Sequence, residues 1–255
     1  MNATCWNPTL YNQKHSFVYQ YGESLVDELN PQPNEHILDL GCGTGELTQR
    51  ISTFGACATG IDSSAALIAT AQQRFPSIEF RQQDAAQLSD TECYDAIFSN
   101  AVLHWVEDQA ALTRGLFQAL RPGGRLVAEF GGQGNVQKIV NPLRETLHQH
   151  GYETQAAAQP WYFPSVGQYA SLLESHGFEV QWMHHYDRPT ELNDTTDGIV
   201  DWLRMFAGSF LARIATDKQN IILEEVQEKL RTVLYREGKW YADYQRLRVR
   251  AVRPL

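Results

Sequence analysis

The stretch that decides the fold is residues 36–48, with the sequence HILDLGCGTGELT. It begins as a short apolar strand and passes into a turn with three glycines, Gly41, Gly43 and Gly45, before a helical pattern begins. Glycine can adopt a positive φ and lets a ligand lie against bare main chain, and the first turn of a helix presents unpaired N–H groups. We therefore expect a strand, a glycine turn and a helix that together bind a polar ligand.

The spacing of these glycines disfavours a nicotinamide cofactor. Gly-x-Gly-x-Gly is shorter than the dinucleotide fingerprint, and Asp39 precedes the first glycine, where hydride transfer needs no carboxylate. Asp39 would repel a pyrophosphate, whereas it would attract an α-ammonium group. A nicotinamide-dependent oxidoreductase is therefore disfavoured, and absence of nicotinamide binding would exclude it.

More strands are expected after the glycine turn, with helices between them. They cover residues 57–61, 78–81, 94–99 and 125–130. Strands that alternate with helices form a parallel sheet covered on both faces, and ligands lie beyond the carboxyl ends of its strands. Asp62 follows the second strand about 20 residues past the glycines, so we expect it to accept hydrogen bonds from ribose hydroxyls. Together with Ser63 it can also cap the next helix.

The motif DLGCGTG at 39–45 resembles the first motif of class I S-adenosylmethionine-dependent methyltransferases, and LRPGG at 120–124 matches a late motif of that family. The resemblance covers residues 37–130, where the elements follow in the family's order. It implies an α/β fold, a Rossmann-like doubly wound sheet that is mostly parallel with an antiparallel last strand. It also implies S-adenosyl-L-methionine as the cofactor.

The same resemblance implies roles for residues at the strand ends. Asp84 would accept a hydrogen bond from the adenine amino group while the N–H of Ala85 supplies another contact, although a solvated turn is the alternative. Asn100 directly follows the fourth strand, where side chains point toward the reaction centre. No metal site is expected. The expected cofactor-binding residues are Tyr11, Asp39, Gly41, Gly43, Gly45, Asp62, Ser63, Asp84, Ala85 and Asn100.

We expect three parts in the chain. Residues 16–29 form an amphipathic helix, and 1–34 are assigned to an N-terminal lid with Tyr11, His15 and Phe17, unless the helix only covers the sheet. The core comprises 35–188 and 241–255, and its last strand alternates strictly at 244–251. Residues 189–240 are a mostly helical insertion that we expect to cap the substrate. The aromatic segment 161–163 lies between prolines and is expected to pack in the core rather than line a pocket.

Weaker motifs narrow the resemblance. They are WNP at 6–8, SNAVLHW at 99–105, FGGQGN at 130–135 and YFPS at 162–165. Together they resemble the group of trans-aconitate 2-methyltransferase and malonyl-acyl carrier protein methyltransferases, which implies a small-molecule acceptor. Enzymes that methylate exocyclic amines of DNA bases carry Asn or Asp, then Pro-Pro and an aromatic residue after the fourth strand. This chain has Asn-Ala-Val there, which counts against a nucleobase amine.

Two catalytic schemes remain open. A sulfonium methyl is already electrophilic, so in-line displacement chiefly needs positioning, and an ionised carboxylate acceptor needs no base. A guanidinium can hold a carboxylate through two hydrogen bonds, and the candidates are Arg246, Arg204 and Arg188, each of which can instead be a surface arginine. For a phenol or carbon acid, His104 would be the base, because its usual pKa lies near neutrality. His104 replaces a Gln expected in that group and can also be an ordinary histidine before a helix.

A non-catalytic regulator that binds S-adenosylmethionine is a further alternative. Binding alone would need Asp39, Asp62 and Asp84 as much as catalysis would. The large apolar insertion favours an enzyme, because a cap can keep water away from the methyl group.

Composition limits which partners and which cellular compartment are expected. A formal net charge of -9 argues against a general nucleic-acid binder. The four cysteines are scattered without metal-ligand spacing, which indicates a reducing compartment. The N-terminus lacks a signal-peptide core, and no apolar run is long enough to cross a bilayer. We therefore expect a cytoplasmic transferase, monomer or homodimer, with a small-molecule acceptor and without nucleic-acid or membrane partners.

Overall fold

The computed structural model describes residues 16–192 and 198–255, of which 16–21 are described as backbone only. Tyr11 and His15, and the side chain of Phe17, lie outside this description. The chain divides into two compact units. Unit 1 holds the described residues up to Gln133, together with Trp161–His185 and Arg246–Leu255. Unit 2 holds Gly134–Pro160 and Tyr186–Gln245.

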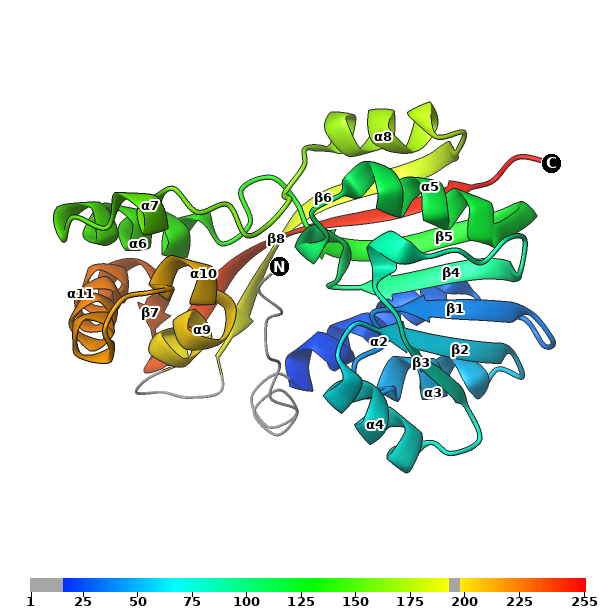
Figure 1. The fold of residues 1–255 in the computed structure, drawn as a ribbon, viewed down its shortest axis with the longest axis horizontal. Helices are drawn as coiled ribbons and strands as arrows, with labels where there is room; N and C mark the ends of the chain where they lie inside the picture. Colours follow the sequence, from blue (N-terminus) through cyan, green and yellow to red (C-terminus); the bar gives the residue numbers. More distant parts are fainter. Residues whose placement is uncertain (1–15, 193–197) are drawn as a thin grey trace. The chain divides into compact units, whose positions relative to one another are not determined.

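The strands form one mixed sheet in the order β3-β2-β1-β4-β5-β8-β6, and β7 pairs with β8 off this path (Figure 1). Neighbouring strands in the sheet order β3-β2-β1-β4-β5 pair in parallel, and β8 lies antiparallel to β5. The predicted Rossmann-like sheet with an antiparallel last strand is therefore confirmed. The bounds are β1 His36–Leu40, β2 Cys57–Asp62, β3 Glu79–Gln82, β4 Tyr94–Asn100, β5 Leu120–Gly131, β6 Glu179–Glu191, β7 Tyr235–Arg236 and β8 Lys239–Val252.

Helices cover both faces of the sheet in unit 1, because successive strand residues point to opposite faces. Leu38 and Leu126 are buried with α5 and α8, whereas Ile37 and Val127 are buried with α2 and α3. The helical elements of unit 1 are α2 Ser16–Leu29, α3 Glu46–Ser52, α4 Ala65–Arg74, α5 Gln109–Ala119 and α8 Val166–Ser175, with short 3-10 turns η1 Ala85–Gln87 and η2 Leu103–Trp105.

Unit 2 is mainly helical. Its apolar residues Ile199, Trp202 and Leu203 share the buried face of α9, and Trp202 Nε1 donates a hydrogen bond to Tyr244 Oη at 2.7 Å. The chain breaks at Ala207, so that Phe210 belongs to a separate helix. The helices are α6 Gln137–Gln149, α7 Glu153–Ala156, α9 Gly198–Phe206, α10 Gly208–Leu211 and α11 Thr216–Leu234.

Strand β8 begins at Lys239, before the predicted 244, because Trp240 and Ala242 continue its buried positions. Near the end of β6, the polar residues Arg188 and Thr190 are buried. Leu192 N donates to Trp240 O at 2.8 Å, which ties the end of β6 to the beginning of β8. Within the described residues, no helix is long and apolar enough to cross a membrane.

Candidate functional site

The glycine turn follows β1, and its three glycines have φ values of 79°, 56° and 88°. L residues avoid this left-handed region, which explains the glycines at these positions. A Cβ on Gly41 would clash with the side chain of Val102, and one on Gly45 would lie 2.8 Å from the ring of Phe80. A Cβ on Gly43 would meet nothing within 4 Å. Gly43 therefore leaves bare main chain open to a ligand.

Asp39 lies below this turn with only 2% of its surface exposed. Its Oδ2 accepts a hydrogen bond from Thr48 Oγ1 at 2.6 Å. The pKa of Asp39 is raised from 3.8 to about 7: burial is the main cause, the hydrogen bond from Thr48 opposes it, and the nearby carboxylates of Asp62 and Glu46 add to it. The carboxyl group is therefore only partly ionised near neutral pH, and a cation beside it would favour the ionised form.

Asp62 ends β2 and holds the glycine turn. Gly43 N donates to its Oδ2 at 3.1 Å, and Ser64 N donates to its Oδ1 at 2.8 Å. Burial raises the pKa of Asp62, and these two N–H groups oppose the shift. Each oxygen still has a lone pair that a hydroxyl can use. Ser63 is exposed, and Ser64 caps α4 instead, its Oγ accepting from Leu67 N at 3.4 Å.

The other predicted cofactor residues also lie at strand ends. Asp84 follows β3, where its exposed side chain caps η1 by accepting from Ala86 N at 2.9 Å. Ala85 begins η1 and is half-buried. Asn100 ends β4 and is nearly buried, and a Cβ on Gly22 of α2 would lie 3.0 Å from its Nδ2. Helix α2 therefore covers the end of β4.

The structure brings His104 and Arg246 together, although they are far apart in the sequence. Gly131 N, at the end of β5, donates to His104 Nδ1 at 3.3 Å, and Gly131 pairs with Arg246 across β5 and β8. Both side chains are buried, with 6% and 4% exposed. Burial, and then the positive charge of Arg246, hold the pKa of His104 well below its usual value of 6.5.

Aromatic residues pack beside His104, and three of them belong to the segment 161–163 that is expected in the core. The ring centroids of Trp105 and Phe163 lie 5.4 and 5.6 Å from that of His104, and Trp161 stacks on Phe163 at 5.6 Å. Tyr162 N donates to His104 O at 2.9 Å. These four aromatic residues are half-buried: Tyr162 packs against the core as predicted, whereas the rings of Trp105 and Phe163 lie beside His104. The flanking prolines predict a stiff segment, but they do not predict that it contacts His104.

The pair Glu129 and Arg248 was missed by the sequence analysis. Glu129, on β5, is 1% exposed, and Arg248 Nη2 on β8 lies 2.7 Å from its Oε2. Arg248 Nη2 also donates to Ser24 Oγ of α2 at 3.1 Å. The pair therefore ties α2 to the sheet. The alternation of arginines along β8 was the available signal, but it does not identify their partners.

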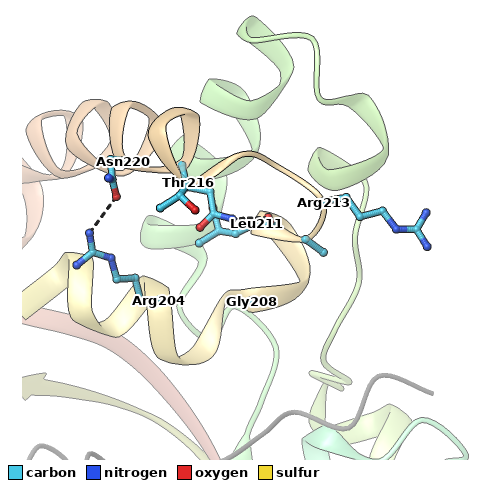
Figure 2. A pocket seen from close by; sticks show the side chains of 8 residues that line it. Arg204, Gly208, Leu211, Arg213, Thr216 and Asn220 are labelled. Carbon is cyan, nitrogen blue, oxygen red and sulfur yellow. Dashed lines mark hydrogen bonds between the residues drawn. The ribbon is translucent and has the colours of Figure 1, made fainter.

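Neither of the other clamp candidates belongs to unit 1. Arg188 is buried in the part of β6 that belongs to unit 2. Arg204 lines a hollow of about 610 Å³ within unit 2, where its Nη2 donates to Asn220 Oδ1 at 3.2 Å (Figure 2). Figure 2 shows Arg213 of the same hollow pointing away from Arg204. No group of three or more metal-ligating side chains occurs in the described parts of the chain.

Comparison with known proteins gives consistent results. Residues 37–124 match the model of a methyltransferase domain family. An uncharacterized methyltransferase of Schizosaccharomyces pombe is 33% identical over 95% of this chain and 96% of its own. A trans-aconitate 2-methyltransferase of Paracidovorax citrulli is 37% identical over 78% of each chain. The crystal structure of a putative methyltransferase from Bacillus halodurans superposes with a TM-score of 0.64 at 16% identity, covering 91% of this chain and 98% of the other.

Proposed function

Because the chain belongs to the class I S-adenosylmethionine-dependent methyltransferases, we propose that it transfers the methyl group of S-adenosyl-L-methionine to the carboxylate of a small organic acid. The observation that carries this proposal is the buried Arg246 beside His104, at the edge of the sheet where β4 and β5 end. The similarity to trans-aconitate 2-methyltransferase, whose name specifies an organic acid, supports it.

The residues at the glycine turn fit the cofactor. Asp39 suits the α-ammonium group, because a cation beside the buried carboxyl favours its ionised form. Asp62 has lone pairs for two ribose hydroxyls, and Gly43 leaves room for a ligand against its main chain. Asp84 and the N–H of Ala85 suit the adenine ring. Bound here, the cofactor supplies a methyl group on a sulfonium, which is an electrophile without further activation.

For a carboxylate acceptor, the protein has to do little more than position the two reactants. It is ionised at neutral pH, so that no proton has to be removed before it attacks. Holding two reactants in line can be worth an effective molarity of about 10⁵ to 10⁸ M. A guanidinium such as that of Arg246 can fix the acceptor through two parallel hydrogen bonds. We also propose the cytoplasm as its compartment and a monomer or homodimer as its state, on the sequence arguments given above.

The test begins with calorimetric titration of the protein with S-adenosylmethionine and S-adenosylhomocysteine. A methyl-transfer screen over small carboxylic acids, phenols and acyl thioesters follows. We expect binding of both cofactor forms and turnover of at least one carboxylic acid. Arg246→Ala should lose that turnover while it retains S-adenosylhomocysteine binding, and Arg246→Lys should lose less. Turnover of phenols alone, or cofactor binding with no turnover, would refute the proposal and favour the base mechanism or the regulator.

A further inference from the structure

We propose that His104 is a neutral hydrogen-bond donor to the methyl acceptor, not its base, so that His104 and Arg246 form a donor pair that selects an anionic oxygen. This inference rests on the proposed function, since it specifies how the same site recognises a carboxylate. It removes the base mechanism from the two schemes that the sequence leaves open.

The hydrogen bond from Gly131 fixes the tautomer of His104. Gly131 N is a donor, so Nδ1 of His104 must accept with its lone pair and cannot carry a proton. A neutral imidazole has one proton, which therefore lies on Nε2. That nitrogen can donate a hydrogen bond, but it has no lone pair in the ring plane with which to remove a proton from an acceptor.

The surroundings of the ring keep it neutral. Trp105 and Phe163 pack near the ring, and it is 6% exposed. From β8, Arg246 adds a positive charge that disfavours a second one on the imidazole. Of the other elements in contact with His104, β5 meets it through the backbone N–H of Gly131, and the segment around Tyr162 meets it through the backbone of Tyr162 and the uncharged ring of Phe163. No described carboxylate lies against the ring to stabilise an imidazolium.

The Nε2–H is left for a ligand. In the described part of the chain, no residue accepts a hydrogen bond from His104 Nε2. An N–H beside a guanidinium offers two donors and no acceptor. Such a pair binds a carboxylate, whereas it repels an ammonium group and leaves a neutral amine with no base.

Two matched variants separate a donor from a base. The amide nitrogen of Gln reaches about as far as Nε2 of His, whereas that of Asn reaches only about as far as Nδ1. We expect His104→Gln to retain kcat/KM for the carboxylic acid found by the screen within about fivefold. We expect His104→Asn to lose about tenfold to a hundredfold, the range for a hydrogen bond to a charged group. A base would instead make both variants lose about 10² to 10⁴.

The cofactor affinity completes the kinetic test. S-adenosylhomocysteine titration should give the same affinity for wild type and both variants, which shows that they fold. Equal kcat/KM for the Gln and Asn variants would overturn the donor proposal and leave carboxylate methylation intact.

A measurement on the tautomer needs no acceptor. In protein labelled with ¹⁵N-histidine, the imidazole signals missing from His104→Gln belong to His104. We expect them to show the Nε2-protonated neutral ring from pH 6.5 to 8. An imidazolium, or a proton on Nδ1, would refute the inference whatever the substrate is. Conversely, a phenol as the only acceptor together with an Nε2-protonated ring would refute the proposed function and keep the tautomer assignment.

Discussion

Replacing Asp39 by Asn should make the protein more stable and a poorer binder of its cofactor. The carboxyl group is buried, and its pKa is raised from 3.8 to about 7, mainly by burial. Asn has nearly the same shape, and its Oδ1 can still accept the hydrogen bond from Thr48. The substitution therefore removes the charge while it keeps the packing.

The magnitude follows from linkage. The folded protein binds the Asp39 proton more tightly than the unfolded chain does, so stability falls as pH rises from about 4 to about 7. Above pH 7 the full difference, about 4 kcal/mol, opposes folding. The Asn variant lacks this term, although burial of its amide offsets part of the gain. We expect Tm at pH 8 to rise by at least about 4 °C, and Tm at pH 5 to change little.

The assay combines thermal unfolding at pH 5 and pH 8 with calorimetric titration of S-adenosylmethionine. Wild type at pH 7 should release about half a proton on binding, because the ammonium group ionises Asp39. The variant should release none from this site and bind at least about tenfold more weakly. Titration in two buffers of different ionisation enthalpy measures the proton. The reasoning would be refuted if the gain in Tm over wild type were no larger at pH 8 than at pH 5. It would also be refuted if the variant bound the cofactor as tightly as wild type.

Three more outcomes are expected. Arg248→Leu should cost about 3 to 5 kcal/mol in urea unfolding, since it removes the guanidinium that pairs with buried Glu129, and Arg248→Lys should cost less. Gly43→Ala should lose about 1 to 2 kcal/mol of folding stability and bind S-adenosylhomocysteine at least about tenfold more weakly than wild type. Gly41→Ala, whose new methyl group clashes with Val102, should unfold at a clearly lower Tm. The pKa of His104 is depressed in the folded protein, so the neutral imidazole contributes fully to stability above pH 6.5, and this contribution is lost as pH falls below that value. On acidification, the Tm of His104→Gln should therefore fall less steeply than that of wild type.

The glycine turn and the sheet could be predicted because their signals are local. Glycines at positive φ, apolar strands and the residues just after them lie within a few positions of one another, and the family resemblance was confirmed by the relatives. The contact between His104 and Gly131 could not be predicted in this way. It depends on how the chain beyond β4 folds against the end of β5, and the tautomer of His104 depends on that contact.

The burial of polar residues near the end of β6 could not be predicted for a different reason. Arg188 and Thr190 look like surface residues in the sequence, and their burial depends on contacts within unit 2. The ionisation of Asp39 also escapes a sequence argument, because the pKa depends on burial and on carboxylates from other elements. The roles assigned to the cofactor residues, and the cap at 189–240, stay predictions.

The discontinuity of unit 2 restricts how this enzyme can be recombined with its relatives. Its two segments are joined by hydrogen bonds: Val136 N and Lys138 N donate to the O and Oδ2 of Asp243, and Lys229 Nζ donates to Thr146 Oγ1. A chimera that exchanges only 186–245 would separate these partners. Crossover points should therefore fall near residues 133, 160, 185 and 245, and both segments should come from the same parent.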